Sequence, residues 1–251
     1  MSMNTTIAAP KANDGRSLVD RAVQAVTDHI RENTLRVGDS LPGEAHFATT
    51  LGVSRAVMRE AFGALAALRL IDVGNGRKPR VGAIDGSVIA SSLDHAVSTA
   101  QITVPEVWDV RRTIEIRTAA LAAECRTDAE AKQIVDLADA MAGAMDDFPA
   151  MSRHDIAFHE AIARASHNAL FVQIVCSFAP LMEVAIPAAW HTRGTYDRRH
   201  IMIERHRAVA DAILRGDPAA ASAAMDAHFD TAIGDVLKGE IGADPVRFMS
   251  S

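Results

Sequence analysis

The sequence predicts a mainly α-helical protein: a small N-terminal domain that ends in a β-hairpin, followed by an all-helical C-terminal bundle. Of the 251 residues, 49% are hydrophobic but only 4% aromatic, which favours helices over a β-sandwich. A hairpin signal occurs near residue 75, and long helical patterns follow it. Residues 1–82 hold 11 Lys and Arg against 8 Asp and Glu, a net +3, whereas residues 83–251 hold 15 against 24, a net −9. Because only the N-terminal third carries a net positive charge, only this third is compatible with nucleic-acid binding.

Three helices and a hairpin are expected in the N-terminal domain. Residues 18–32 and 44–51 carry apolar side chains at helical spacing, separated by a break rich in glycine and proline. Ser54 is a good N-cap for a third helix that runs to about residue 68. β-Branched residues on both sides of Asn75-Gly76 predict a hairpin. This order of elements predicts a winged helix-turn-helix over residues 17–82, preceded by a flexible tail of residues 1–16.

The third helix is expected to read DNA, because the second helix of a helix-turn-helix places its N-terminal residues in the major groove. Arg55 and Arg59 lie one turn apart, and each can bind either a guanine edge or a phosphate. Ser54 and the helix N-terminus offer backbone donors to another phosphate. The core-facing residues are expected to be Val57, Ala61, Leu65 and Leu68, and the basic residues of the wing to be Arg77, Lys78 and Arg80.

The stretch SLPGEAHFATTLGVSRAVMREAFGALAALRLIDV resembles the GntR-type winged helix-turn-helix, over about residues 18–81. The resemblance implies DNA-binding roles for Arg36, Glu44 and Gly76, in addition to Ser54, Arg55 and Arg59. The sequence departs from the family pattern at Arg69, where a glycine usually ends the helix. The wing also differs, because it reads NGRKPRV instead of a Gly-Arg-Gly-Thr pattern.

Helical patterns fill the rest of the chain, which is expected to form one domain over residues 83–251. The expected helices cover residues 87–99, 105–125, 128–146, 150–165, 169–186, 196–215 and 218–238. No apolar run approaches the roughly 20 residues that span a bilayer, and no secretory signal is recognisable. Cys125 and Cys176 lie far apart, as expected of free thiols. We therefore expect a cytoplasmic protein without a membrane partner.

Four polar residues are expected to point into this helical domain. Asp155 and His159 share a helix face with Phe158 and Ile162, and two later helices place His206 and His228 among apolar residues. A buried carboxylate is costly without a partner. Three imidazoles and one carboxylate suit a divalent transition metal such as zinc or nickel. The alternative is that each residue is only hydrogen-bonded within the core.

The C-terminal half also resembles the FCD domain of FadR-type GntR regulators, over roughly residues 85–240. The similar segments are VRRTIEIRTAALAA, DIAFHEAI, ERHRAVADAILRGDPAAA and MDAHF. The resemblance implies a divalent metal held by Asp155, His159, His206 and His228, with a small carboxylate metabolite against it. Arg111 lies on the inward face of its helix and is the expected carboxylate clamp. The alternative is that Arg111 pairs with a buried acid such as Asp155 or Glu183.

These features lead to a metabolite-responsive transcriptional regulator that binds a palindromic operator as a homodimer. By resemblance we expect a repressor that the effector releases. Two alternatives remain open. One is a constitutive DNA-binding protein whose helical domain only dimerises. The other is a metal-dependent hydrolase fused to a DNA-binding domain, which the absence of HExxH, GxSxG and P-loop motifs disfavours, so no enzyme is expected.

Overall fold

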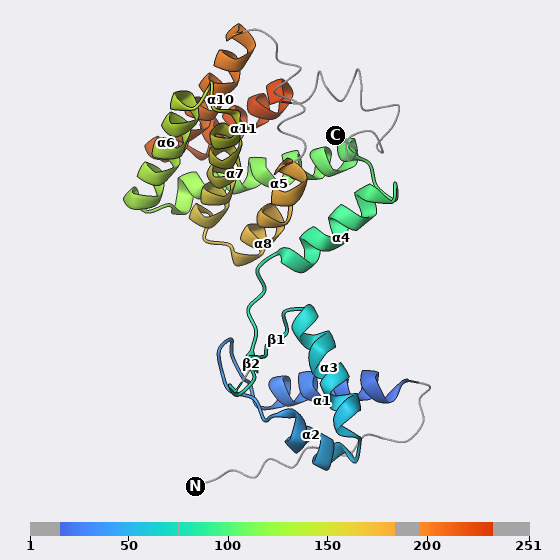
Figure 1. Cartoon of the computed structure of the whole chain (residues 1–251). Coiled ribbons are helices and arrows are strands. Elements are labelled where there is room, and N and C mark those ends of the chain that lie inside the picture. Colours follow the sequence, from blue (N-terminus) through green and yellow to red (C-terminus); the bar gives the residue numbers. More distant parts are fainter. Residues whose placement is uncertain (1–15, 75, 184–195, 233–251) are drawn as a thin grey trace. The chain divides into compact units, whose positions relative to one another are not determined.

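Figure 1 presents the computed structural model of the chain, which describes residues 16–74, 76–183 and 196–232. The chain divides into two compact units, residues 1–88 and 89–251, and each is considered by itself. The described residues form ten helices and a single two-stranded sheet, which confirms the predicted fold class. The predicted tail, Asn75 of the hairpin turn, and the stretches 184–195 and 233–251 lie outside the described residues.

The N-terminal unit contains α1 (Leu18–Glu32), α2 (Glu44–Leu51), α3 (Arg55–Ala67), β1 (Ile71–Asp72) and β2 (Arg80–Val81). The strands pair antiparallel with Ile71 opposite Val81, as the hairpin signal predicts. Ser40 forms a further bridge to Arg80 on β2, so the loop before α2 is attached to the wing. The core gathers apolar residues from all three helices and both strands, among them Val26, Phe47, Phe62, Ile71 and Val81.

The buried face of α3 differs from the expected one. Ala61 and Leu65 are buried as predicted and Val57 is partly buried, but the helix also buries the large side chains of Met58 and Phe62. Leu68 was predicted to be buried and is 50% exposed. The reason is that α3 ends at Ala67, so Leu68 already lies at the C-cap, where the chain leaves the core.

Arg69 takes the place of the glycine that usually follows this helix. Its φ of 58° lies in the left-handed region, where a residue with a Cβ is strained. The N–H of Arg69 donates to the carbonyl of Ala66, and the N–H of Leu70 donates to that of Leu65. These two bonds form a Schellman turn, so the chain reverses here as it would with glycine, despite the arginine side chain.

The C-terminal unit is all-helical. Its elements are α4 (Ser87–Ser98), α5 (Val104–Cys125), α6 (Asp128–Gly143), α7 (Phe148–Ala165), α8 (Ala169–Ser177), α10 (Tyr196–Arg215) and α11 (Pro218–Ala232). The long helix α5 packs against α7, α8, α10 and α11, and α6 packs against α7 and α10 (Figure 1). The helix predicted over residues 169–186 is interrupted at Phe178, where the chain forms a turn. None of the described helices is long and apolar enough to cross a membrane.

Candidate metal centre and nucleic-acid interface

The start of α3 presents its basic side chains to solvent. Gly52, with φ 66°, ends α2, and Ser54 then caps α3 by accepting a hydrogen bond from the Val57 N–H at 3.2 Å. Arg55 and Arg59 follow on the first two turns, and both are exposed. This local sequence therefore produces a free helix N-terminus with two accessible guanidinium groups, which is the arrangement that a major groove requires.

The other residues expected to contact DNA lie on the same unit. They differ in whether their side chains are exposed or already paired within the protein. Glu44, the first residue of α2, approaches Arg59 of α3, with 3.8 Å between Oε2 and Nε. Arg36, Gly76, Arg77 and Lys78 are exposed, and Gly76 adopts φ 70° in the wing turn. The exposed cations of α3 and those of the wing therefore belong to a single folded unit.

Arg80 is partly engaged within the protein. Its Nη1 donates to the carbonyl of Gly38 at 2.6 Å, and its backbone bridges to Ser40. The side chain thus attaches the loop before α2 to the wing, which leaves fewer of its five N–H donors for a phosphate than an unattached arginine offers.

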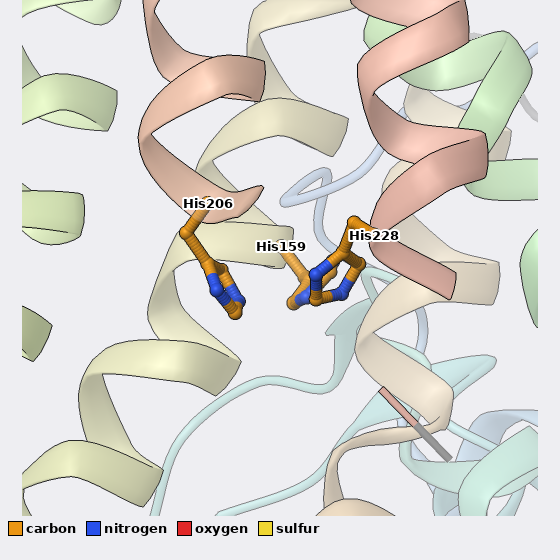
Figure 2. A group of neighbouring side chains, drawn as sticks. All are labelled: His159, His206 and His228. Carbon is orange, nitrogen blue, oxygen red and sulfur yellow. The ribbon is translucent and has the colours of Figure 1, made fainter. Parts of the chain in front are cut away.

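Three histidines from separate helices meet in the interior of the C-terminal unit (Figure 2). His159 on α7, His206 on α10 and His228 on α11 each offer one ring nitrogen within 4.8 Å of the other two. The ring centroids of His206 and His228 are 4.4 Å apart, and His159 lies 5.2 Å from His228. All three side chains are buried. The sequence prediction that these residues converge is therefore met by the geometry.

His206 and Asp155 are arranged in an unusual way. The Nδ1–H of His206 donates to the Met202 carbonyl at 2.9 Å, so in a neutral ring Nε2 carries a lone pair. That Nε2 lies 2.9 Å from Oδ1 of Asp155. Two electron-rich atoms at this distance repel each other unless a cation, a proton or a metal ion, is shared between them.

His159 is oriented by a residue of α5. Its Nδ1 contacts Oε2 of Glu115, and the other carboxylate oxygen of Glu115 accepts a hydrogen bond from Nε of Arg111. Glu115 and Arg111 are 1% and 3% exposed. On the opposite edge of the imidazole, Nε2 is buried without a hydrogen-bond partner among the described residues. His228 likewise has a buried Nδ1 for which the described residues provide no hydrogen-bond partner.

The local electrostatics keep His228 and Asp155 in the forms that bind metals. Burial, together with nearby His206 and His159, lowers the pKa of His228 well below its ordinary value, which favours the neutral ring. Burial alone would raise the pKa of Asp155, but the adjacent His206 and the charges of His159 and Arg111 outweigh it, so this pKa is lowered. A neutral imidazole at His228 together with an ionised carboxylate at Asp155 contributes to a donor set suited to zinc or nickel.

Arg111 points inward as the sequence predicts, but its acidic partner is Glu115 rather than Asp155 or Glu183, the second of which is exposed. The guanidinium lies over the Trp108 ring at 4.9 Å and near Phe229 at 5.6 Å. The indole N–H of Trp108 is buried and has no partner among the described residues. A ligand acceptor atom beside Arg111 would supply one.

The sequence analysis missed Glu115 and Trp108. The signal for Glu115 was present, because it follows Arg111 by four residues on one helix, the spacing at which opposite charges meet. Trp108 precedes Arg111 by three residues and carried only the signal of an apolar core residue. Both become recognisable once α5 is placed against α7 and α11.

Together, the winged helix-turn-helix and the helical bundle with its buried histidines define a DNA-binding regulator with a second, all-helical domain. Residues 18–81 match the gntR family of bacterial regulatory proteins, and residues 106–231 match the FCD domain. The chain belongs to the GntR family and carries an FCD domain. It is therefore a transcriptional regulator and not an enzyme, which removes the hydrolase alternative.

Characterised relatives cover most of the chain. The regulator LutR of Bacillus subtilis is 31% identical over 214 residues, which are 84% of this chain and 96% of LutR. The Glc operon transcriptional activator of Escherichia coli K12 is 29% identical, over 87% of this chain and 89% of its own length. The repressor NanR of an Enterobacter species is 25% identical, over 86% and 84%. A GntR structure from Streptococcus agalactiae shares the fold, with a TM-score of 0.59, 23% identity and coverage of 85% of this chain and 97% of that one.

Proposed function

We propose that this regulator senses a small carboxylate metabolite at a divalent metal ion, which Asp155, His159, His206 and His228 hold inside the helical unit. The observation that carries the proposal is the convergence of buried ring nitrogens that lack partners, with the carboxylate of Asp155 beside one of them. Bound there, a zinc or nickel ion would supply a positive charge and an open coordination position for an anionic ligand. The proton-sharing alternative for His206 and Asp155 leaves the nitrogen atoms of His159 and His228 unexplained.

The carboxylate would lie between the metal ligands and Arg111. Support comes from the ring contacts, because Phe229 lies next to both His228 and the Arg111 guanidinium. The partnerless indole N–H of Trp108 favours an effector that brings a hydrogen-bond acceptor. Arg111 is shared with Glu115, so the effector would add to an existing ion pair rather than meet a free cation.

The N-terminal unit would bind a palindromic operator as part of a homodimer, with Arg55 and Arg59 in the major groove and Arg77 and Lys78 on the backbone. Two-fold symmetric operators follow from two-fold symmetric dimers. The effector shifts the equilibrium between binding and non-binding arrangements only by binding one of them better. We assign the role of repressor by similarity to the NanR repressors. The Glc operon regulator of E. coli, in contrast, is named an activator.

The test begins with selection of duplexes from a random library by the zinc-loaded chain, followed by sequencing. An enriched palindrome is the expected result. The affinity for that duplex is then measured with acetate, lactate, succinate, gluconate and benzoate, with zinc present and after chelation. At least one acid should weaken binding in the zinc-loaded protein and lose its effect after chelation. If an acid weakens DNA binding equally with and without zinc, the effector site does not depend on a metal and the proposal is wrong. If no acid acts while DNA binds tightly, the constitutive alternative is supported.

A variant then tests the effector position. Trp108→Phe keeps the ring but removes its N–H donor, so the affinity for the active acid should fall by about 1–3 kcal/mol, the cost of leaving a charged acceptor without its donor. Zinc affinity should be unchanged. An unchanged acid affinity would remove Trp108 from the effector site.

A further inference from the structure

Glu115 occupies a position in the buried unit that the assignment of metal ligands does not account for. It lies on α5, is 1% exposed, and uses one carboxylate oxygen for Nε of Arg111 and the other for Nδ1 of His159. The histidine comes from α7, so the carboxylate joins two helices. A fully buried charge with a dedicated partner on each oxygen is a specific arrangement, because desolvation makes a carboxylate costly unless it is fully paired.

The direction of the hydrogen bonds follows from the chemistry of the groups. An ionised carboxylate only accepts, so Nδ1 of His159 must carry the hydrogen. In a neutral ring, Nε2 is then bare, and Nε2 is the buried atom of His159 without a partner. We propose that Glu115 is a positioning residue that holds His159 as the Nδ1–H tautomer, with Nε2 directed at the metal. This inference rests on the proposed metal site, and it goes beyond it by assigning the tautomer and its cause.

Arg111 determines which way an amide side chain at residue 115 would be oriented, and therefore which tautomer of His159 it would favour. The substitution Glu115→Gln leaves one acceptor oxygen and puts an NH2 group in place of the other oxygen. Since Arg111 can only donate, the amide oxygen must face Arg111, and the NH2 group must then face His159. His159 would have to accept at Nδ1 and carry its hydrogen on Nε2, which is the form that cannot bind a metal. If Arg111 is also removed, the amide is free to turn its oxygen toward His159.

The competing explanation is that Glu115 and Arg111 form an ion pair that only holds the helices together. In that case the two charges affect unfolding but not the preference of His159 for one tautomer. Removal of both charges avoids a buried charge without a partner, which strongly destabilises folds. The informative comparison is therefore between charge-neutral double variants that differ only in whether residue 115 can accept a hydrogen bond.

The experiment compares R111M/E115Q with R111M/E115M by zinc titration against a chromophoric chelator, in the full chain. Loss of a carboxylate or amide partner of a metal-binding histidine costs about 10–100-fold in affinity. We expect R111M/E115M to bind zinc 10–100-fold more weakly than R111M/E115Q, and E115Q alone to bind more weakly than R111M/E115Q. Equal zinc affinities for the two double variants would overturn the proposal. Absence of zinc binding by the wild-type chain would instead contradict the metal site itself.

A second measurement needs no folded variant of Glu115. In the metal-free wild-type chain labelled with 15N-histidine, long-range 15N–1H spectra distinguish the two neutral tautomers, and the His159→Gln spectrum identifies the signals. The expected result is a protonated Nδ1 and a bare Nε2 for His159. A protonated Nε2 with a bare Nδ1 would overturn the proposal, whether or not zinc binds.

Discussion

Nε2 of His206 and Oδ1 of Asp155 lie 2.9 Å apart in the interior, while the other nitrogen of the same imidazole donates to a backbone carbonyl. The neutral ring therefore directs a lone pair at a carboxylate oxygen. This relationship is unfavourable unless a cation lies there, and His159 and His228 each have a further buried ring nitrogen without a hydrogen-bond partner in the described part of the chain. The convergence of all four residues is the physical basis for the proposed metal ion.

Asp155→Asn should weaken zinc binding without destabilising the metal-free protein. The amide removes the negative charge, and its NH2 group can donate to Nε2 of His206, which relieves the repulsion with no cation present. We expect the zinc affinity to fall by more than about 10-fold, the lower limit for loss of even an indirect partner. Chelator competition measures the affinity, and Asp139→Asn, at an exposed ion pair with Arg207, is the control. Equal zinc affinities for the two variants would exclude Asp155 as a ligand.

Arg59→Ala should weaken binding to the selected operator by about 1–3 kcal/mol, because Arg59 is the exposed guanidinium one turn into α3. The melting temperature should change little, since its pairing with Glu44 at 3.8 Å is an exposed contact of small energy. Fluorescence anisotropy with labelled duplex measures the affinity. Arg31→Ala removes the same charge from α1 instead of from the reading helix, and should cost less. Equal losses would indicate that Arg59 acts only through net charge.

Gly82→Ala should destabilise the N-terminal unit. An added Cβ would lie 2.3 Å from the backbone oxygen of Arg69, and a backbone atom cannot move aside as a flexible side chain can. We expect a loss of about 1–3 kcal/mol in the free energy of unfolding, typical of overpacking. Gly63→Ala on α3 is the matched control, because its Cβ meets nothing within 4 Å. That substitution should stabilise the helix by about 1 kcal/mol. Calorimetry on both variants measures the change in unfolding free energy. A similar change in both would contradict a close approach between residue 82 and the backbone of Arg69.

Arg69→Gly should stabilise the same unit by about 1 kcal/mol, because φ 58° strains every residue that has a Cβ. The lost ion pair with Asp85 is half-exposed at 3.6 Å and contributes little. Urea unfolding followed by circular dichroism measures the change. A destabilised Arg69→Gly protein would mean that the arginine side chain offsets its own backbone strain.

Local signals explain why the element boundaries were predictable from sequence. Ser54 and the proline after Asp217 mark helix starts in the chain itself, and α3 and α11 begin where they indicate. The interruption at Phe178 is marked by Pro180 two residues later, and the single helix predicted over residues 169–186 overlooked this signal for a helix end. The exposed Leu68 was misplaced because the turn at Arg69 has no glycine to mark it.

The histidine cluster was predictable for a related reason. Asp155 and His159 share a face with apolar neighbours, so burial of the face brings both inward. The orientation of each ring was not predictable, because it depends on groups from other helices. Glu115 of α5 reaches His159 of α7 only after the bundle has packed. Helical periodicity therefore indicates which side chains are inside, while tertiary packing determines which atoms they direct at one another.

The most direct test of the account is calorimetric titration of zinc into the wild-type chain after exhaustive chelation, with His159→Ala and His206→Ala titrated in parallel. We expect one ion per chain for the wild type, and for each variant either no binding or an affinity lower by at least about 10-fold. A wild-type chain that binds no zinc or nickel, or variants that bind as the wild type does, would contradict a metal ion at this cluster.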